Sequence, residues 1–278
     1  MNALLTSQFT IHNSLFIINM NNSPKPYAGT QAVIRAMRLL KVFTDEQPEW
    51  GLSAIAKTVG LNKTTAYRLL TALESEGLLM RSPHADAFRL GPEIVVLGGR
   101  ALRANDLRSV AKPALEHLAA QTGETATLEI KVDNRMLIID EVIGDYLMNS
   151  TQSLGTRWPL HATSTGLAIL AHYSDNELAE FLAEPLAQIT PKTCISSDVL
   201  CQELENTRLR GYSVANETLE IGLVVVGAVV RNHDDRIVAA ISLGAPAIRF
   251  TPVHVPEMGK LVLETAVSIS SQLGYQTA

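Results

Sequence analysis

Residues 52–76 carry the pattern that most constrains the fold of this chain. Their sequence, LSAIAKTVGLNKTTAYRLLTALESE, predicts two helices joined by a tight turn. The first helix begins at Ser53, a residue type that caps helix N-termini, and Gly60 suits the left-handed conformation that ends it. The second helix runs from Lys63 to about Glu76. A short helix, a tight turn and a longer helix together predict a helix-turn-helix.

The second helix has one apolar face and one polar face. Apolar residues at the spacing i, i+3, i+4 and i+7 form a buried stripe of Ala66, Leu69, Leu70 and Leu73. The polar face is suited to a DNA major groove. The candidate DNA-contacting residues of this region are Ser53, Asn62, Lys63, Thr64, Thr65, Tyr67 and Arg68. The alternative is an ordinary helical hairpin with a solvated face, because such hairpins are common.

The segment that follows supports DNA binding. Residues 78–91, LLMRSPHADAFRLG, place two short apolar runs around a Ser-Pro-His turn, which predicts a β-hairpin. A hairpin directly after a recognition helix is a wing. Arg81, His84 and Arg89 on it are candidate contacts to phosphate or to the minor groove. Residues 30–91 are therefore predicted to be a winged helix-turn-helix domain.

The charge is divided unevenly along the chain. The net charge is −5, but residues 30–91 hold eight Lys and Arg against six Asp and Glu, a net charge of +2. Residues 92–278 hold 14 against 22, a net charge of −8. An acidic region repels phosphate, so the two regions have separate tasks. Because +2 is weak for DNA binding, we expect a homodimer or homotetramer on a double-stranded operator.

Other classes of protein find little support. Cys194 and Cys201, separated by six residues, fit no zinc pattern, and we expect no metal or cofactor. No run of 18 apolar residues predicts a membrane span, so a cytoplasmic location is expected. Residues 1–29 are predicted to be a flexible tail. Leu15–Ile18 is apolar, but no basic residue precedes it as in a signal peptide, and Met20 is an alternative start.

Helical segments flank the predicted winged domain. Residues 30–43 predict an amphipathic helix, with Val33, Ala36, Leu39, Leu40 and Phe43 on its apolar face. Gly91-Pro92 begins another helix, because proline is favoured in a first turn. We expect residues 92–104 to form a linker helix and residues 105–278 to form an effector-binding and oligomerisation domain.

Beyond residue 124 the apolar period changes from helical to alternating. Residues 125–132 and 135–142, split by Asp-Asn, predict one β-hairpin, and residues 223–230 and 236–245 predict another. Residues 147–151 are a possible further strand. Helices are expected from near residue 163 and over 175–182, 197–208 and 256–273. Strands and helices in this order predict an α+β fold, an antiparallel sheet covered by helices.

An enzyme is the main competing class. His161, Asp140, Glu141 and the two cysteines are the candidate catalytic groups, but no set with recognisable nucleophile geometry accompanies them. We therefore expect no catalytic residues. A DNA-binding architectural protein without a ligand is a third reading, although it leaves the large acidic region unexplained.

The order of motifs resembles that of the IclR-type transcriptional regulators. The matching stretches are AVIRAMRLLKVF, residues 52–79, FRLG, TGETATL, LHATSTG with LAILA, RGYSV with Gly222, and AAISLGAP followed by Arg249. They cover about residues 30–274. The resemblance implies an N-terminal winged helix-turn-helix, a C-terminal GAF-like effector domain, a dimer or dimer of dimers, and a small metabolite that alters operator binding. The function expected is regulation of organic-acid or aromatic metabolism.

The resemblance also implies a set of effector-pocket residues. Carried onto this sequence, they are Ser164, Thr165, Ala215, Val225, Ser242 and Gly244. Relatives that bind small acids typically carry an acid, a thiol or hydroxyl, and a serine at the positions of Ala215, Val225 and Gly244. We therefore expect an effector less acidic, or bulkier and more aromatic, than small keto acids. The alternative is that Ala215 and Val225 fill the core and close the pocket.

Overall fold

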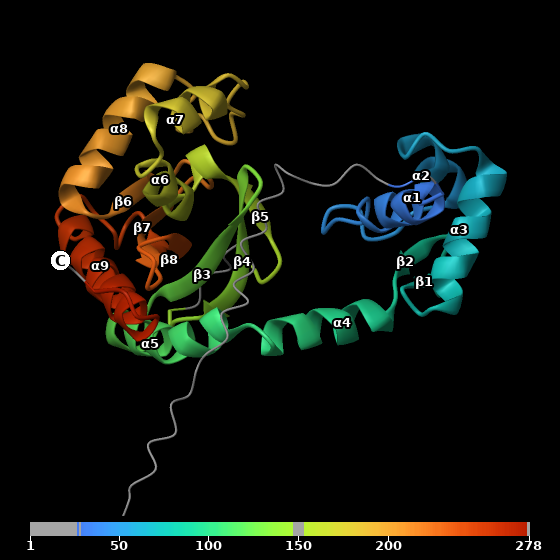
Figure 1. The fold of residues 1–278 in the computed structure, drawn as a ribbon, viewed down its shortest axis with the longest axis horizontal. Helices are drawn as coiled ribbons and strands as arrows, with labels where there is room; N and C mark the ends of the chain where they lie inside the picture. The colour runs from blue at the N-terminus through green and yellow to red at the C-terminus, as the bar shows by residue number, and fades with distance from the viewer. Residues whose placement is uncertain (1–26, 28, 147–152, 277–278) are drawn as a thin grey trace, which may run out of the picture. The chain divides into compact units, whose positions relative to one another are not determined.

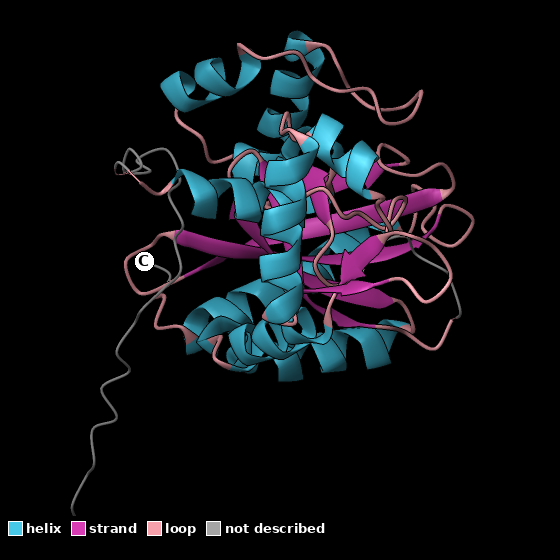
Figure 2. Ribbon diagram, turned by 90° about the vertical axis from the view of Figure 1, so that its right-hand side faces the viewer, coloured by secondary structure: helices cyan, strands magenta, loops and turns pink. Residues whose placement is uncertain are grey.

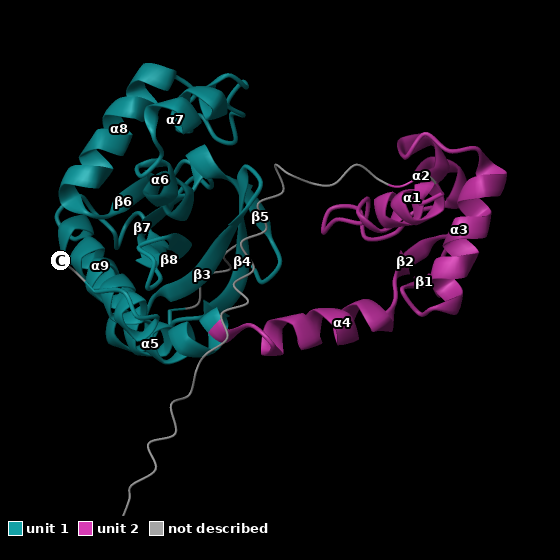
Figure 3. Ribbon diagram, viewed as in Figure 1, with its two compact units in different colours: residues 1–21, 107–278 teal, residues 22–106 magenta. Residues whose placement is uncertain are grey.

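The computed structural model describes residues 27, 29–146 and 153–276. The chain divides into two compact units (Figure 3). The N-terminal unit ends at Asp106 and the C-terminal unit begins at Leu107. The predicted strand over residues 147–151 falls within residues 147–152, which lie outside the described part, as does nearly all of the predicted tail.

The described N-terminal unit is a winged helix-turn-helix (Figure 1). Its elements are α1 (Gln31–Leu40), α2 (Leu52–Thr58), α3 (Lys63–Ser75), β1 (Leu79–Arg81), β2 (Phe88–Leu90) and α4 (Pro92–Arg103). Leu39, Ile55, Leu70 and Phe88 are buried together in its core. The predicted stripe of α3 faces this core, although Leu69 is only partly buried. Val33 was predicted on the buried face of α1, but it is exposed.

The turn between α2 and α3 follows the sequence prediction except at its first cap. Gly60 has φ of +69°, the left-handed conformation expected at the end of α2. The N-cap of α2 is Gly51 and not Ser53, because the helix begins at Leu52 and Ser53 lies inside its first turn. Asn62 caps α3, where its side chain accepts a hydrogen bond of 2.8 Å from the Thr65 backbone.

The predicted wing is an antiparallel pair in which Leu79 faces Leu90 and Arg81 faces Phe88. Trp50 adds a bridge on the outer side of β2, and its backbone exchanges hydrogen bonds of 2.9 and 2.8 Å with Phe88. The Trp50 indole Nε1 also donates to the Val42 carbonyl at 3.1 Å. The segment before α2 therefore ties the wing to the end of α1, a long-range contact that local pattern does not predict.

The C-terminal unit is built on an antiparallel six-stranded sheet with the order β5-β4-β3-β8-β7-β6. The strands are β3 (Thr125–Val132), β4 (Arg135–Val142), β5 (Arg157–Pro159), β6 (Ser213–Asn216), β7 (Leu223–Arg231) and β8 (Ile237–Pro246). Both predicted hairpins are confirmed, and β8 pairs with β3 to join them at the centre. The two edge strands, β5 and β6, were not predicted because three or four residues carry too little period.

Helices cover both faces of this sheet (Figures 1 and 2). They are α5 (Asp106–Thr122), α6 (Ser164–Leu170), α7 (Asp175–Leu182), α8 (Ser197–Arg210) and α9 (Val255–Gln272), with a 3₁₀ turn, η2, at Leu160–Ala162. Helices α5 and α9 pack on one face, where Leu115, Leu128 and Val262 are buried. Helices α6, α7 and α8 form a second core on the other face. No helix among the described residues is long and apolar enough to cross a membrane.

Candidate functional site

Helix α3 presents the polar face predicted for DNA contact. Lys63, Thr64, Tyr67 and Arg68 are exposed on it, while Ala66 and Leu70 face the core. Thr65 is half-buried, and Asn62 is occupied as the cap. This division follows from the helical period, because residues three or four apart share a face. The face is thus held rigidly by the same stripe that builds the core.

The cations on α3 are available for a partner. Lys63 and Arg68 form no ion pair within the described residues, and both lie in the first half of the helix. The acidic Glu74 lies in the second half and pairs with Arg81 of the wing at 3.3 Å. Recognition helices contact bases mainly through their N-terminal residues, so the charge of α3 is placed at the appropriate end.

The wing residues fall into different environments. Arg81 stacks on the Phe88 ring at 4.0 Å and also lies 3.6 Å from Asp86, so internal contacts hold its guanidinium. His84 is exposed at the hairpin tip. Arg89 is half-buried, and its Nε makes no hydrogen bond to another described residue. Of the three predicted contacts, Arg81 and His84 are exposed, and Arg81 is held by contacts within the wing and with α3.

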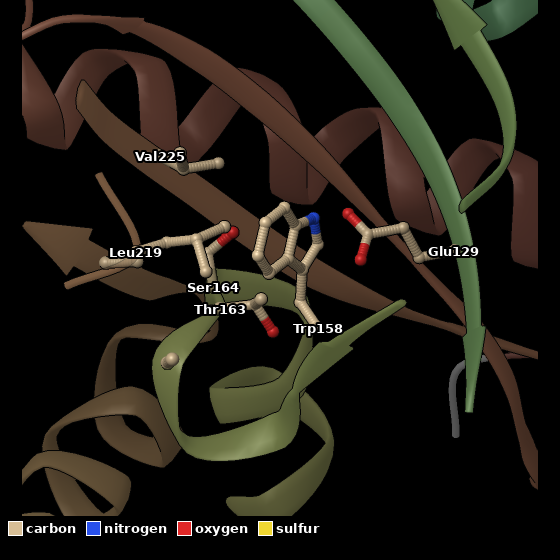
Figure 4. Close-up of a pocket in the computed structure, with 8 residues that line it drawn as sticks. Glu129, Trp158, Thr163, Ser164, Leu219 and Val225 are labelled. Carbon is tan, nitrogen blue, oxygen red and sulfur yellow. The ribbon is translucent and has the colours of Figure 1, made fainter. Parts of the chain in front are cut away.

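The C-terminal unit contains a pocket on the face of the sheet that α6 covers (Figure 4). Its cavity volume is about 10 Å³, and the wider space not filled by protein atoms, part of it open to solvent, is about 240 Å³. Its lining is Glu129, Trp158, Ala162, Thr163, Ser164, Ala215, Leu219 and Val225. These residues come from β3, β5, β6 and β7, from the loop between β6 and β7, and from the η2–α6 junction, so only the tertiary fold brings them together.

Two glycines allow the start of α6 to approach its neighbours. A Cβ on Gly166 would lie 2.1 Å from the Leu160 carbonyl oxygen, and one on Gly227 would lie 2.9 Å from Ser164 Oγ. Thr163 caps α6 by accepting a 3.0 Å hydrogen bond from the Gly166 backbone. This close packing holds Ser164 against β7 at the base of the pocket.

Glu129 is a buried acid in the pocket wall. Its carboxyl accepts hydrogen bonds from the hydroxyls of Thr127, at 2.9 Å, and Thr165, at 2.7 Å. Ser242 lies 2.6 Å from the Thr127 hydroxyl and extends the network. Burial raises the pKa of the Glu129 carboxyl, because desolvation of the charged form outweighs the hydrogen bonds that stabilise it.

Two other polar groups of the pocket make no hydrogen bond among the described residues. They are the Trp158 indole Nε1 and the Ser164 hydroxyl, and both atoms are buried. In Figure 4 the indole nitrogen points toward the Glu129 carboxyl. Buried donors without a partner are uncommon in folded proteins and are costly, so each calls for an explanation.

The structure places the six predicted effector residues in three different settings. Ser164, Ala215 and Val225 line the pocket. Thr165 and Ser242 belong to the network around Glu129. Gly244 lies beside Val225: a Cβ added to Gly244 would be 3.5 Å from Cγ2 of the Val225 side chain. Glu129 and Trp158 were not predicted. The signal for Glu129 was an acid at an inward position of an alternating strand, in phase with Thr127.

The candidate catalytic residues are engaged in structural contacts. His161 is buried and donates through Nε2 to the Ala187 carbonyl at 2.8 Å. Asp140 is buried beside Arg108 and Lys112, each at 3.2 Å, at the α5 side of β4. Cys194 and Cys201 are free thiols. The structure does not bring these groups together around a cavity.

Family models match both parts of the chain. The model described as IclR helix-turn-helix domain matches residues 32–83, and the model described as bacterial transcriptional regulator IclR C-terminal matches residues 99–271. The chain is 30% identical to the HTH-type transcriptional regulator XynR of Escherichia coli over 88% of this chain and 98% of that protein. It is 28% identical to the transcriptional repressor IclR of the same organism, over 88% of this chain and 90% of that protein.

Solved structures show the same architecture. The IclR of Thermotoga maritima is 31% identical with a TM-score of 0.69 over 87% of this chain and 98% of that one. An IclR homolog from Microbacterium hydrocarbonoxydans, complexed with 4-hydroxybenzoate, is 26% identical to this chain. Its TM-score is 0.75, and the match covers 87% of this chain and 98% of that one.

Proposed function

This chain belongs to the IclR family of bacterial transcriptional regulators, and from that premise we propose that it is a repressor or activator whose operator binding responds to a small molecule. The N-terminal unit, residues 30–91 with the helix α4 that follows, is assigned to DNA. Residues 105–278 are assigned to effector binding and oligomerisation. We assign the protein to the cytoplasm, the compartment of its DNA partner. We assign it no enzymatic activity.

The observation that carries the DNA assignment is the free cationic face of α3. Lys63 and Arg68 are exposed on a helix whose opposite face packs against the core through Ala66, Leu70 and Leu73. Phosphate contacts supply most non-specific affinity, and contacts from a helix to base edges supply specificity. A single unit of net charge +2 presents few cations, so we propose that a homodimer or homotetramer binds paired half-sites.

The observation that supports an effector is the pocket beside Ser164. It is bounded by apolar Ala215, Leu219 and Val225, yet it contains polar groups that lack partners in the described chain. The Microbacterium homolog was solved with 4-hydroxybenzoate, and we propose that this chain likewise takes an effector bulkier than a small keto acid. The genes under control would then serve organic-acid or aromatic metabolism.

Selection of a binding site from random DNA, followed by gel-shift titration of the full chain, tests this function. The selected DNA is then titrated with glyoxylate-sized acids and benzoate-sized aromatics. We expect one aromatic at least to change operator affinity. A chain that selects no DNA sequence would contradict the proposal, DNA binding indifferent to every compound would favour an architectural protein, and turnover of a compound would favour an enzyme.

A further inference from the structure

The pocket presents an unusual set of polar groups to a ligand. In Figure 4 the Trp158 indole ring is drawn between the buried Glu129 carboxyl, toward which its Nε1 points, and the Ser164 hydroxyl. Thr127 and Thr165 already donate to the two carboxyl oxygens, which holds the carboxyl in place. The site therefore offers a fixed carboxyl and two donors without partners among the described residues.

The remainder of the lining is apolar or nearly so. Ala162, Ala215, Leu219 and Val225 contribute methyl groups and no charge, and all four are buried. A ligand of aromatic size enters by displacing neighbouring side chains, and it gains about 0.8 kcal/mol for each CH₂ removed from water. The body of the ligand is therefore expected to be apolar, with its polar group at the Glu129 end.

We propose, resting on the function proposed above, that the pocket takes a hydroxylated apolar small molecule, a phenol or an alcohol, whose hydroxyl lies between Trp158 Nε1 and the Glu129 carboxyl. The hydroxyl oxygen accepts from the indole N–H, and the hydroxyl proton is donated to the carboxyl. Trp158 and Glu129 are then the residues that determine specificity, and Ser164 donates to a second acceptor.

A hydroxyl suits this site better than the other common polar groups. It donates to an ionised carboxyl and accepts from a protonated one, whereas a ligand carboxylate is tolerated only beside the protonated form. An ammonium group would suit the ionised carboxyl, but it has no lone pair for the indole N–H to donate to. Burial raises the pKa of Glu129, and a hydroxyl remains complementary on either side of that pKa.

The inference is tested by calorimetric titration of the full chain with phenol, toluene and benzoate. Phenol and toluene have nearly the same shape and differ in the hydroxyl. We expect phenol to bind about tenfold more tightly than toluene, the factor typical of one net hydrogen bond. Toluene or benzoate binding as tightly as phenol, or no detectable binding of phenol, would overturn the inference.

Variants assign the preference to the two residues. Trp158→Phe keeps an aromatic ring and removes the N–H, so phenol should lose about tenfold in affinity while toluene, the internal control, changes little. Glu129→Leu should remove the phenol preference in the same way. If one of these variants does not fold, the phenol preference of the other variant tests the inference. An undiminished phenol preference in a folded variant contradicts the assigned role.

Gel-shift titration separates this inference from the proposed function. A chain that binds selected DNA and releases it with benzoate but not with phenol would remain a regulator and would overturn the hydroxyl inference. A chain that prefers phenol over toluene but selects no DNA would support the inference and contradict the regulatory function.

Discussion

The Thr165 hydroxyl donates a 2.7 Å hydrogen bond to Glu129 Oε2 and so joins the first turn of α6 to strand β3. Both side chains are buried. Thr165 was predicted to contact an effector directly, but its hydroxyl is directed to the carboxyl that lines the pocket. The hydrogen bond fixes the position of the Glu129 carboxyl relative to the first turn of α6.

Glu129 is expected to make the free energy of unfolding fall as pH rises. Burial raises the pKa of its carboxyl above the ordinary value of 4.5, so the folded chain holds more protons than the unfolded chain above that pH. The contribution is lost between 4.5 and the folded pKa. Glu129→Gln should remove this decline and gain stability relative to wild type as pH increases, measured by urea unfolding at a series of pH values. Glu180→Gln, at an exposed position, is the control, and equal pH slopes for Glu129→Gln and wild type would contradict the prediction.

Arg68→Ala should weaken operator binding by about 1–3 kcal/mol if the guanidinium contacts a base. Loss of a phosphate contact would instead weaken binding to all sequences and reduce the salt slope by about one unit. Gel-shift titration at several salt concentrations distinguishes the two. Arg135→Ala, an exposed arginine of the C-terminal unit, serves as the matched control. Unchanged binding by a folded Arg68→Ala would exclude Arg68 from the interface.

Val95→Asp is expected to weaken self-association. Val33, Val95 and Leu97 are exposed apolar side chains of the N-terminal unit, and Val95 is 76% exposed. We propose that the exposed apolar side chains of α4 add to the contacts between chains, where a buried carboxylate would be costly. Sedimentation should show an even-numbered oligomer for wild type and smaller species for the variant, with weaker operator binding. Val95→Ile, which keeps the side chain apolar at the same position, is the control. A wild-type monomer that binds a single half-site tightly would contradict the prediction.

Arg249→Ala should destabilise the C-terminal unit by about 2–4 kcal/mol. Arg249 forms a bidentate pair with the buried Glu124, with distances of 2.5 Å from Nε to Oε1 and 2.8 Å from Nη2 to Oε2. Removal of one partner leaves a buried charge, although the partly exposed arginine reduces the cost below that of a fully buried pair. Denaturant unfolding measures the change. The double variant Glu124→Leu Arg249→Met should recover much of the loss, and a double variant as unstable as Arg249→Ala would contradict this account.

Gly166→Ala should destabilise the C-terminal unit by about 1–3 kcal/mol or more, because its Cβ would lie 2.1 Å from the Leu160 carbonyl oxygen and the backbone would have to move. The same movement would disturb Ser164 and the pocket. Gly98→Ala is the matched control, since a Cβ on this helical glycine meets nothing within 4 Å and should stabilise α4 by about 0.5–1 kcal/mol. Equal unfolding midpoints for the two variants would contradict the prediction.

The sequence alone determined the elements whose cause is local. Helical period placed the buried stripe of α3, Gly60 marked the end of α2, and alternating strands split by short turns placed both hairpins. Such features depend on residues a few positions apart, so they can be read without coordinates. The polar face of α3, and with it the candidate DNA contacts, followed from the same period.

Only the tertiary structure decided the pocket. Glu129, Trp158 and Ser164 lie on β3, β5 and α6, and no local pattern states that the edge strand carrying Trp158 lies beside β4. Sequence position also does not show whether a hydroxyl faces a ligand or a neighbour. The family resemblance assigned Thr165 and Ser242 to the effector pocket, and in the structure their hydroxyls hydrogen-bond within the network around Glu129. The pairing of β3 with β8 joins the two hairpins into one sheet, and the paired residues are more than a hundred positions apart in the sequence. This long-range pairing determines which side chains meet.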